Sequence, residues 1–291
     1  MTRPQIFSRA AVKLRMTAND SGFDIIIEPE KNTADFFREL VKFRELFFFM
    51  AWRDILVRYK QTVIGVAWSV IRPLMSMIVF SVIFGRVAKL PSGGIPYPVM
   101  VFSALLPWQF FSNSMQAASE SLIRSESMIS KVYFPRVILP ASAVIVSTID
   151  FAISFAVLCI LMVIFRFTPS AMMIFIPVFF IPAAMSALGA GFLFSALGVK
   201  YHDFRHIMPF ILQAGLFVSP VGFSSSIIPQ RWRMIYSVNP MAGVIDGFRW
   251  CIHGGGLYVP GVIISVISSA VIFVIGLKYF RKTEKFFADY I

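Results

Sequence analysis

Several residue types are scarce in this chain of 291 residues, and each scarcity excludes a class of protein. Two cysteines, Cys159 and Cys251, cannot build a disulfide framework, and with three histidines they offer no spacing typical of a metal centre. The sequence also has no GxxxxGK loop for phosphates, no HExxH motif and no paired carboxylates suited to acid–base chemistry. We therefore expect no catalytic, cofactor-binding or metal-binding residues.

Acidic residues are scarce as well, with 15 Asp and Glu against 27 Lys and Arg and a net charge of +12. In a soluble chain this excess would suggest nucleic acid as a partner. Here, however, 57% of the residues are hydrophobic and the mean hydropathy is +0.76, which is typical of a membrane protein. The basic residues flank apolar runs rather than forming a groove, so we expect membrane lipids, and no nucleic acid, as partners.

Six long apolar segments divide the chain and predict an all-α, polytopic membrane protein with six transmembrane helices. They cover approximately residues 65–85, 97–115, 137–165, 172–198, 207–223 and 259–280. The segment 207–223 is short and is interrupted by prolines and glycines.

Basic residues alternate between the gaps that separate these segments. Near the ends of the spans, 12 lie in the even-numbered gaps and at the termini, against 6 in the odd-numbered gaps. Cytoplasmic loops carry the excess of Lys and Arg, so the pattern predicts that both termini are cytoplasmic. The first 45 residues contain no apolar run long enough for a signal peptide, and we expect none.

The region before the first span falls into two parts. Residues 1–32 form a predicted cytoplasmic tail, and residues 33–63 mix charged with apolar residues throughout. Phe36, Leu40, Phe43 and Phe47 recur at helical spacing, which predicts an amphipathic helix in the membrane interface or against a soluble partner. Residues 64–291 then form the transmembrane domain.

Two charged residues lie inside predicted spans. Arg72 either extends to the cytoplasmic headgroups or faces an aqueous cavity. Asp150 lies near the middle of the third segment, where it either relays protons or makes a polar bond between helices. The second interpretation is favoured, because no other span carries an acid or histidine at similar depth.

Small residues recur every fourth position in the fourth segment, at Ala183, Ala187, Gly191 and Ser195. This pattern predicts a face on which another helix packs closely.

Two gaps have unusual patterns. Residues 117–136 predict one short amphipathic cytoplasmic helix, ended by Pro135 and suited to docking into another protein. Residues 224–257 are too charged to span the membrane and too apolar for a free loop. They predict two short helices, split at Asn239 and Pro240, which re-enter the outer leaflet as a gate or serve as an inert outer collar.

Several stretches resemble the membrane subunits of ABC exporters that move lipid-linked O-antigen or teichoic-acid-type polysaccharides. They are RDILVRYKQTVIGVAWSVIRPLMSMIVFSVIFG, LLPWQFF, ISKVYFPRVILP and NPMAGVIDGFRW, and the similarity extends in order over roughly residues 34–291. Arg72 departs from the family pattern, which has a neutral residue before the proline, so no role is carried over to it.

The resemblance implies a homodimer in the bacterial inner membrane, bound to two copies of a cytoplasmic ATPase that holds ATP and magnesium. It also implies a coupling loop around residues 119–133 and outer gate helices within 224–250. The candidate coupling residues are Ser119, Leu122, Ser125, Met128, Ile129 and Tyr133. The candidate channel and gate residues are Trp68, Arg72, Phe80, Trp108, Phe111, Trp232, Tyr236 and Trp250. The alternatives are a permease for a drug or small lipid, and a proton-coupled secondary transporter that uses Asp150.

Overall fold

The structure is a computed structural model that describes residues 41–60, 67–129, 131–201 and 203–287. The predicted tail, residues 1–32, and the first part of the predicted amphipathic segment lie outside these residues. The described residues are helical and include no strand, as the sequence predicts for an all-α membrane protein.

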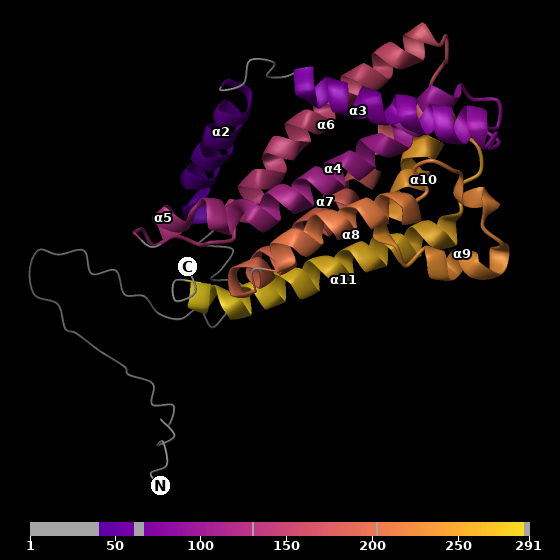
Figure 1. Ribbon diagram of the computed structural model, residues 1–291. Helices are drawn as coiled ribbons and strands as arrows, with labels where there is room; N and C mark the ends of the chain where they lie inside the picture. Colours follow the sequence, from indigo (N-terminus) through magenta and orange to yellow (C-terminus); the bar gives the residue numbers. More distant parts are fainter. Residues whose placement is uncertain (1–40, 61–66, 130, 202, 288–291) are drawn as a thin grey trace, which may run out of the picture.

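A bundle of long helices forms the body of the molecule (Figure 1). Its members are α3 (Ala67–Phe80) continued by the π-helix η1 (Ser81–Val87), α4 (Tyr97–Arg124), α6 (Ile138–Ile164), α7 (Ile176–Lys200) preceded by η2 (Ala171–Phe175), α8 (Phe204–Val218) and α11 (Val259–Thr283) followed by η4 (Glu284–Phe286). Apolar composition sustains these helices through four internal prolines, which are tolerated when neighbouring helices pack against the freed backbone groups.

Four helices of the described chain are long and apolar enough to cross a membrane. They cover Ala67–Val87, Ile138–Ile164, Ala171–Lys200 and Val259–Phe286. Two further helices occupy the positions of the second and fifth predicted spans. α4 has 28 residues but is less apolar, while α8 is apolar but has 15 residues, about 22 Å against a hydrocarbon core of about 30 Å. The structure therefore supports a polytopic membrane protein, and the count of six spans stays a prediction.

Helix α2 (Arg44–Lys60) lies across one end of the bundle, where α5 (Glu126–Ile129) and the end of α11 also lie (Figure 1). Its Met50 and Ala51 are buried against the bundle, while Phe48, Phe49 and Trp52 are more than half exposed. This division agrees with an amphipathic helix, although Phe36 and Leu40 lie outside the described residues.

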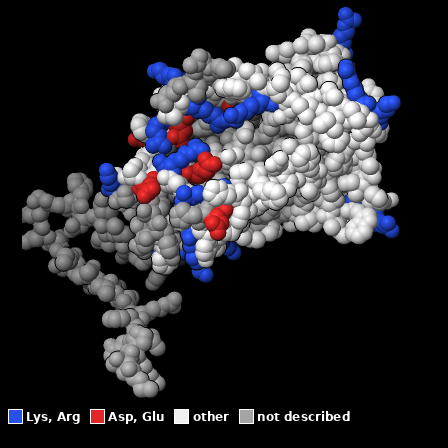
Figure 2. All heavy atoms as spheres, viewed as in Figure 1, with Lys and Arg blue, Asp and Glu red and all other residues white. Residues whose placement is uncertain are grey.

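Charge is distributed unevenly along the bundle (Figure 2). Basic and acidic side chains gather together at the end formed by α2 and α5, which we call the charged end. The middle of the viewed face carries almost none, as expected for a surface in contact with lipid. At the opposite end the visible charges are basic.

The core of the bundle is built around α7, which packs extensively against α4 and α11. Ala183, Ala187 and Ser195 are fully buried, and a side chain at Gly191 would meet Ala118 of α4. The small-residue face predicted from the sequence therefore packs on α4. A second face, which the sequence did not reveal, brings Gly189 so close to Phe273 and Gly276 of α11 that no side chain fits between them.

The opposite end is closed by η3 (Ser225–Ile227), α9 (Gln230–Tyr236) and α10 (Pro240–His253). The two helices are separated at Asn239 and Pro240, as predicted. The side chain of Asn239 accepts a hydrogen bond of 3.0 Å from the Met241 backbone, which caps α10, and Pro240 takes the first helical position. The hairpin is thus defined, while its position relative to a lipid leaflet stays a prediction.

The segment 117–136 differs from its predicted form. α4 continues without a break to Arg124, so the separate helix α5 covers only Glu126–Ile129. Leu122 and Ile129 are buried in a core cluster with Phe134 and Val137. The apolar spacing that predicted a docking face therefore marks contact with the chain's own core, because helical periodicity does not reveal what covers an apolar face.

Candidate functional site

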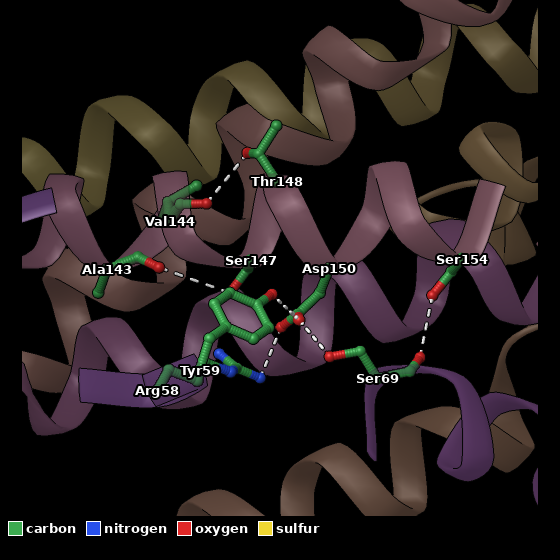
Figure 3. A network of polar contacts seen from close by, with 9 residues as sticks. All are labelled: Arg58, Tyr59, Ser69, Ala143, Val144, Ser147, Thr148, Asp150 and Ser154. Carbon is green, nitrogen blue, oxygen red and sulfur yellow. Dashed lines mark hydrogen bonds and ion pairs between the residues drawn. The ribbon is translucent and has the colours of Figure 1, made fainter. Parts of the chain in front are cut away.

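A cluster of polar contacts at the charged end joins α2, α3 and α6 around Asp150 (Figure 3). The hydroxyl groups of Tyr59 and Ser69 both donate to Oδ1 of Asp150, at 2.6 and 2.7 Å. The guanidinium of Arg58 pairs with the other oxygen, Oδ2, at 2.5 Å. Asp150 itself is 7% exposed, so the carboxylate is buried but has a charged partner and two hydrogen-bond donors.

This cluster favours the structural role of Asp150 over proton relay. The two oxygens of Asp150 are engaged by Arg58 and Tyr59 of α2 and by Ser69 of α3. Burial, together with the bond to Asp150, raises the pKa of Tyr59 to about 12, so its hydroxyl keeps the proton that it donates. Asp150 therefore acts as a bond between helices, which is the interpretation that the sequence favoured.

Asp150 lies beside the start of α3, and its depth in a membrane stays a prediction. Its partner Ser69 belongs to the first turn of α3, and Arg58 and Tyr59 end α2 at the charged end. Although Asp150 is near the middle of α6, its carboxylate lies beside the start of the first span. The position of Asp150 within α6 did not reveal this contact, because it depends on which neighbouring helices pack against that part of α6.

Two adjoining cavities open beside this cluster, and together we call them the basic groove. One has a volume of about 570 Å³ and is lined by Asp150, Trp68, Ser69 and the aromatic rings of Phe110 and Phe151, among others. The other, of about 390 Å³, continues towards the last turns of α4. Three residues, Arg58, Arg72 and Asn113, line both cavities.

Arg72 lies at the wall of this groove and is exposed, and whether it also reaches the lipid headgroups stays a prediction. Its guanidinium stands over the ring of Trp68, 5.9 Å from the ring centroid, in a cation–π arrangement. Two predicted channel residues, Trp68 and Arg72, thus lie together in one cavity. Arg58, Tyr59 and Ser69 were missed as site residues, because nothing local in the sequence pairs them with a residue of α6.

A third cavity, of about 390 Å³, lies at the opposite end between the hairpin and the loops around it. Arg249 lies at its wall and donates to the backbone oxygens of Phe223 at 2.6 Å and Val221 at 2.9 Å. Burial lowers the pKa of Arg249 to about 10, against the effect of nearby Asp246, and raises the pKa of Asp246. The spacing of Asp246 and Arg249 within an apolar helix was the sequence signal that could have identified them.

The remaining predicted channel and gate residues do not converge on one site. Phe80 is buried beside Phe84 and Phe217, while Trp108 contacts Phe111 and lies against Gly215. Trp232, Tyr236 and Trp250 lie on the hairpin at the opposite end. They therefore fall into three levels along the bundle, and whether these levels line one channel stays a prediction.

The predicted coupling residues separate by burial. Ser119, Leu122, Ser125 and Ile129 are buried, and Met128 is half-buried. Tyr133 is 57% exposed and stands next to Val132, which is exposed to the same degree. Any surface that this segment offers to a partner is thus formed by the residues around Tyr133, and the buried members support it from inside.

Comparison with known proteins places this arrangement in a family. Residues 45–253 match the family described as ABC-2 type transporter. The chain is 28% identical to an O-antigen export system permease protein RfbA of Klebsiella pneumoniae over 239 residues, 81% of this chain and 91% of the relative. It is 26% identical to the RfbA protein of Myxococcus xanthus over 215 residues, which cover 73% of this chain and 82% of that protein.

A more distant relative is named for a different substrate. The polysialic acid transport protein KpsM of Escherichia coli is 22% identical over 240 residues, 80% of this chain and 91% of that protein. The matches run through α2 to α10, which include the basic groove and the hairpin. The resemblance inferred from the sequence is confirmed, and the chain belongs to the ABC-2 type transporter family.

Proposed function

We propose that this chain is the transmembrane subunit of an ATP-driven exporter that moves a lipid-linked polysaccharide across the bacterial inner membrane. The observation that carries the proposal is similarity to O-antigen export permeases over 91% of their own length, within the ABC-2 type transporter family. The chain acts as a transport permease and not as an enzyme. Its sequence offers no phosphate-binding loop, so ATP and magnesium bind to a separate cytoplasmic ATPase subunit.

The charged end is the cytoplasmic end in this proposal. The excess of basic residues in alternate gaps supports it, as does the gathering of charged side chains around α2 and α5 (Figure 2). Both termini are then cytoplasmic. Six helices span the membrane, namely α3, α4, α6, α7, α8 and α11, and the hairpin of α9 and α10 re-enters the outer leaflet.

Two copies of the chain form the channel, with two copies of the ATPase below them. The faces available for the second copy are apolar and exposed, with Phe210 and Phe217 on α8 and Met75 on α3 each more than half exposed. Such faces contact either lipid or another apolar surface. A polysaccharide is too wide for the core of one bundle in which α7 packs so closely on α4 and α11, so the path lies between the copies.

Energy enters mechanically through the exposed loop after α5. Tyr133 and Val132 offer a contact surface at the cytoplasmic end, and Ile129 and Leu122 connect this surface to the core. A conformational change of the ATPase can shift the permease only if it contacts the two states differently, and a loop seated on α4 can transmit such a difference.

The hairpin is the outer gate in this proposal. Tyr236 donates to the backbone oxygen of Val218 at 2.9 Å, and Arg249 holds Val221 and Phe223. These bonds attach the hairpin to the last residues of α8 and the connection that follows it. A movement of α8 therefore moves the hairpin with it, which links the channel wall to its outer opening.

The two alternatives differ in their support. Proton coupling through Asp150 is disfavoured by its ion pair with Arg58. Export of a drug or small lipid is the second candidate, and a transport assay that compares these substrates with a lipid-linked glycan distinguishes it.

The proposal is tested with the complete complex in proteoliposomes. We expect ATP-dependent transfer of a lipid-linked glycan across the bilayer, and no transfer when the ATPase carries a substitution that abolishes hydrolysis. Transfer of small lipids or drugs with no transfer of any lipid-linked glycan would contradict it.

The coupling surface is tested in the same assay. Tyr133→Ala should leave the permease folded, because the side chain is largely exposed, and should lower the transport-linked ATPase rate on the order of tenfold. Tyr201→Ala is the matched control, since Tyr201 is 48% exposed at the same end but outside the loop. Equal coupling in both variants would show that the loop does not dock to the ATPase.

A further inference from the structure

The basic groove contains one arginine whose charge the described residues leave uncompensated. Its acidic residues already have partners, since Asp54 pairs with Arg53 at 2.8 Å and Asp150 pairs with Arg58. Arg124, at the far end of the groove, pairs with Glu120. Within the described part of the chain, no carboxylate and no hydrogen-bond acceptor engages Arg72, and its recorded contact is the ring of Trp68.

The position of Arg72 makes this unusual. It lies in the second turn of α3, a helix apolar enough to span a membrane, and next to Pro73, which is buried. An arginine within a span is costly unless it faces a cavity and finds a partner there. Arg72 is exposed and lines both cavities, so a ligand in the groove can reach its guanidinium.

The neighbours of Arg72 define the chemistry of that ligand. Gln109 and Asn113 supply amide groups along α4, and Asn113 lines both cavities together with Arg72. The amide of Gln116 already donates to Glu120. A guanidinium with neighbouring amide donors suits the oxygens of a phosphoryl group, which accept several hydrogen bonds at once.

The surroundings show that the ligand is amphipathic. Ile71 and Met75, on either side of Arg72, are 37% and 53% exposed, which leaves an apolar helix face beside the groove. Inside the cavity, the ring of Trp68 and the hydroxyl group of Ser76 offer surfaces suited to a sugar. The groove thus joins an apolar surface, a cationic centre and a polar chamber in sequence.

We propose that the basic groove binds the phosphoryl headgroup of the lipid-linked substrate, with Arg72 as the residue that contacts the phosphate. The lipid chain lies along the exposed face of α3, and the first sugars enter the chamber beside Asp150. The ion pair of Asp150 with Arg58 joins α6 to α2, the hydrogen bond from Ser69 joins α6 to α3, and the pairing keeps this acid from neutralising Arg72. The inference rests on the proposed function and names the part of the substrate that this subunit recognises.

Binding is tested with the complete complex in nanodiscs of neutral phosphatidylcholine. The probe is geranylgeranyl diphosphate, a phosphorylated isoprenoid without a glycan, and the signal is the change in tryptophan fluorescence that disappears in Trp68→Phe. We expect saturable binding of the probe to the wild type. The affinity should fall on the order of tenfold in Arg72→Gln, because one charge-assisted contact is lost. Arg72→Lys should retain part of the affinity, because the positive charge stays but the planar fork is lost.

The matched control is Arg86→Gln, which removes an exposed arginine from the other end of the same span and should bind as the wild type does. Unchanged affinity in Arg72→Gln, or an equal loss in Arg86→Gln, would overturn the proposal. Geranylgeraniol, which lacks the phosphates, should bind far more weakly, and equal binding would also overturn it.

The source of the phosphate is distinguished by competition. Nanodiscs that contain phosphatidylglycerol should reduce probe binding only slightly if the site belongs to the isoprenoid substrate, whereas full competition would assign it to ordinary anionic lipid and refute the substrate assignment. ATP-driven transfer of a lipid-linked glycan by the wild type is measured separately. If the Arg72→Gln variant transfers the glycan as the wild type does, the proposed site is refuted while the proposed function stands. If the wild type itself transfers no glycan, the proposed function is refuted.

Discussion

Arginines contribute to both ends of the bundle, but the two ends use them differently: Arg249 is buried, whereas Arg72 is exposed. At the opposite end, Arg249 and Arg233 donate to backbone oxygens of the segments that connect the helices, so their guanidinium groups hold the hairpin together. At the charged end, Arg58 pairs with a carboxylate and Arg72 lines an open groove. An arginine whose donors are taken by the backbone supports the fold, whereas one that faces a cavity with its donors unused is available to a ligand.

The same contrast holds for the other polar groups. Ser103 gives its proton to the backbone oxygen of Met100, so Nε2 of His253 must be the donor in the 3.0 Å contact between them. His253 is then neutral, with Nδ1 buried and unpartnered among the described residues. At the charged end, the hydroxyl groups converge on a charged acceptor, Asp150. The structure of the opposite end therefore depends on neutral groups and on donors bound to the backbone. The structure of the charged end depends on ion pairs between arginines and carboxylates.

The largest effect is expected from removing the arginine that binds backbone. Arg249→Met deprives two oxygens of their donors and leaves buried Asp246 with Arg233 alone as a nearby cation, which should cost about 3–5 kcal/mol and release the hairpin. Arg231→Met, at an exposed arginine of the same hairpin, is the control and should change little. Thermal unfolding in detergent measures both, and equal stability of the two variants would remove the distinction between the ends.

A smaller loss is expected at the charged end. Asp150→Ala leaves Arg58 without its carboxylate, but Arg58 is 38% exposed and can rehydrate, so the cost should be about 1–2 kcal/mol. Asp150→Asn keeps an acceptor for Tyr59 and Ser69 and should cost less. If either variant unfolds as readily as Arg249→Met, the carboxylate supports the fold to the same degree as the buried arginine.

The opposite end should also respond to pH through His253. Burial, together with the charge of Arg249, lowers the pKa of His253 to about 4 from 6.5. The unfolded chain therefore takes up a proton below pH 6.5 that the folded chain refuses, so stability is unaffected above pH 6.5 and falls as the pH approaches 4. We expect a difference of about 1 kcal/mol by pH 5.5 between the wild type and His253→Asn, measured as the change of Tm with pH. Parallel pH profiles would show that His253 is solvated.

The smallest effect on stability is expected from Arg72. Since no bond to the described chain is lost, Arg72→Gln should change stability by less than about 0.5 kcal/mol while lowering export. A loss of several kcal/mol in thermal unfolding would mean that this arginine supports the fold, as Arg249 does.

The sequence predicted much of this architecture for identifiable reasons. Long apolar runs determine where helices lie in a membrane, and the break at Asn239 and Pro240 follows from a side-chain cap and a residue that begins helices. The face with Ala183 and Gly191 was predicted because close packing requires small residues at helical spacing. Each of these features depends on residues near one another in the chain.

The polar site could not be predicted in the same way. Tyr59 and Asp150 are separated by 91 positions, and their contact exists because three helices meet at one point. For the same reason the contact of Asp150 with the start of α3 could not be predicted. The helix predicted for 117–136 differs from the observed form on a related ground, because Leu122 and Ile129 share an apolar face that covers the chain's own core, and docking by the exposed loop stays a prediction.

The central claim, that the charged end receives the substrate headgroup and the opposite end holds the gate, is tested most directly by crosslinking. A photoreactive amino acid is placed at Gln109 in the basic groove or at Ser226 beside the hairpin, in the nucleotide-free complex with a lipid-linked glycan radiolabelled in its phosphate. We predict that Gln109 captures the label, that Arg72→Gln abolishes this capture, and that Ser226 captures none before ATP is added. Capture at Ser226 without ATP, with none at Gln109, would contradict the account.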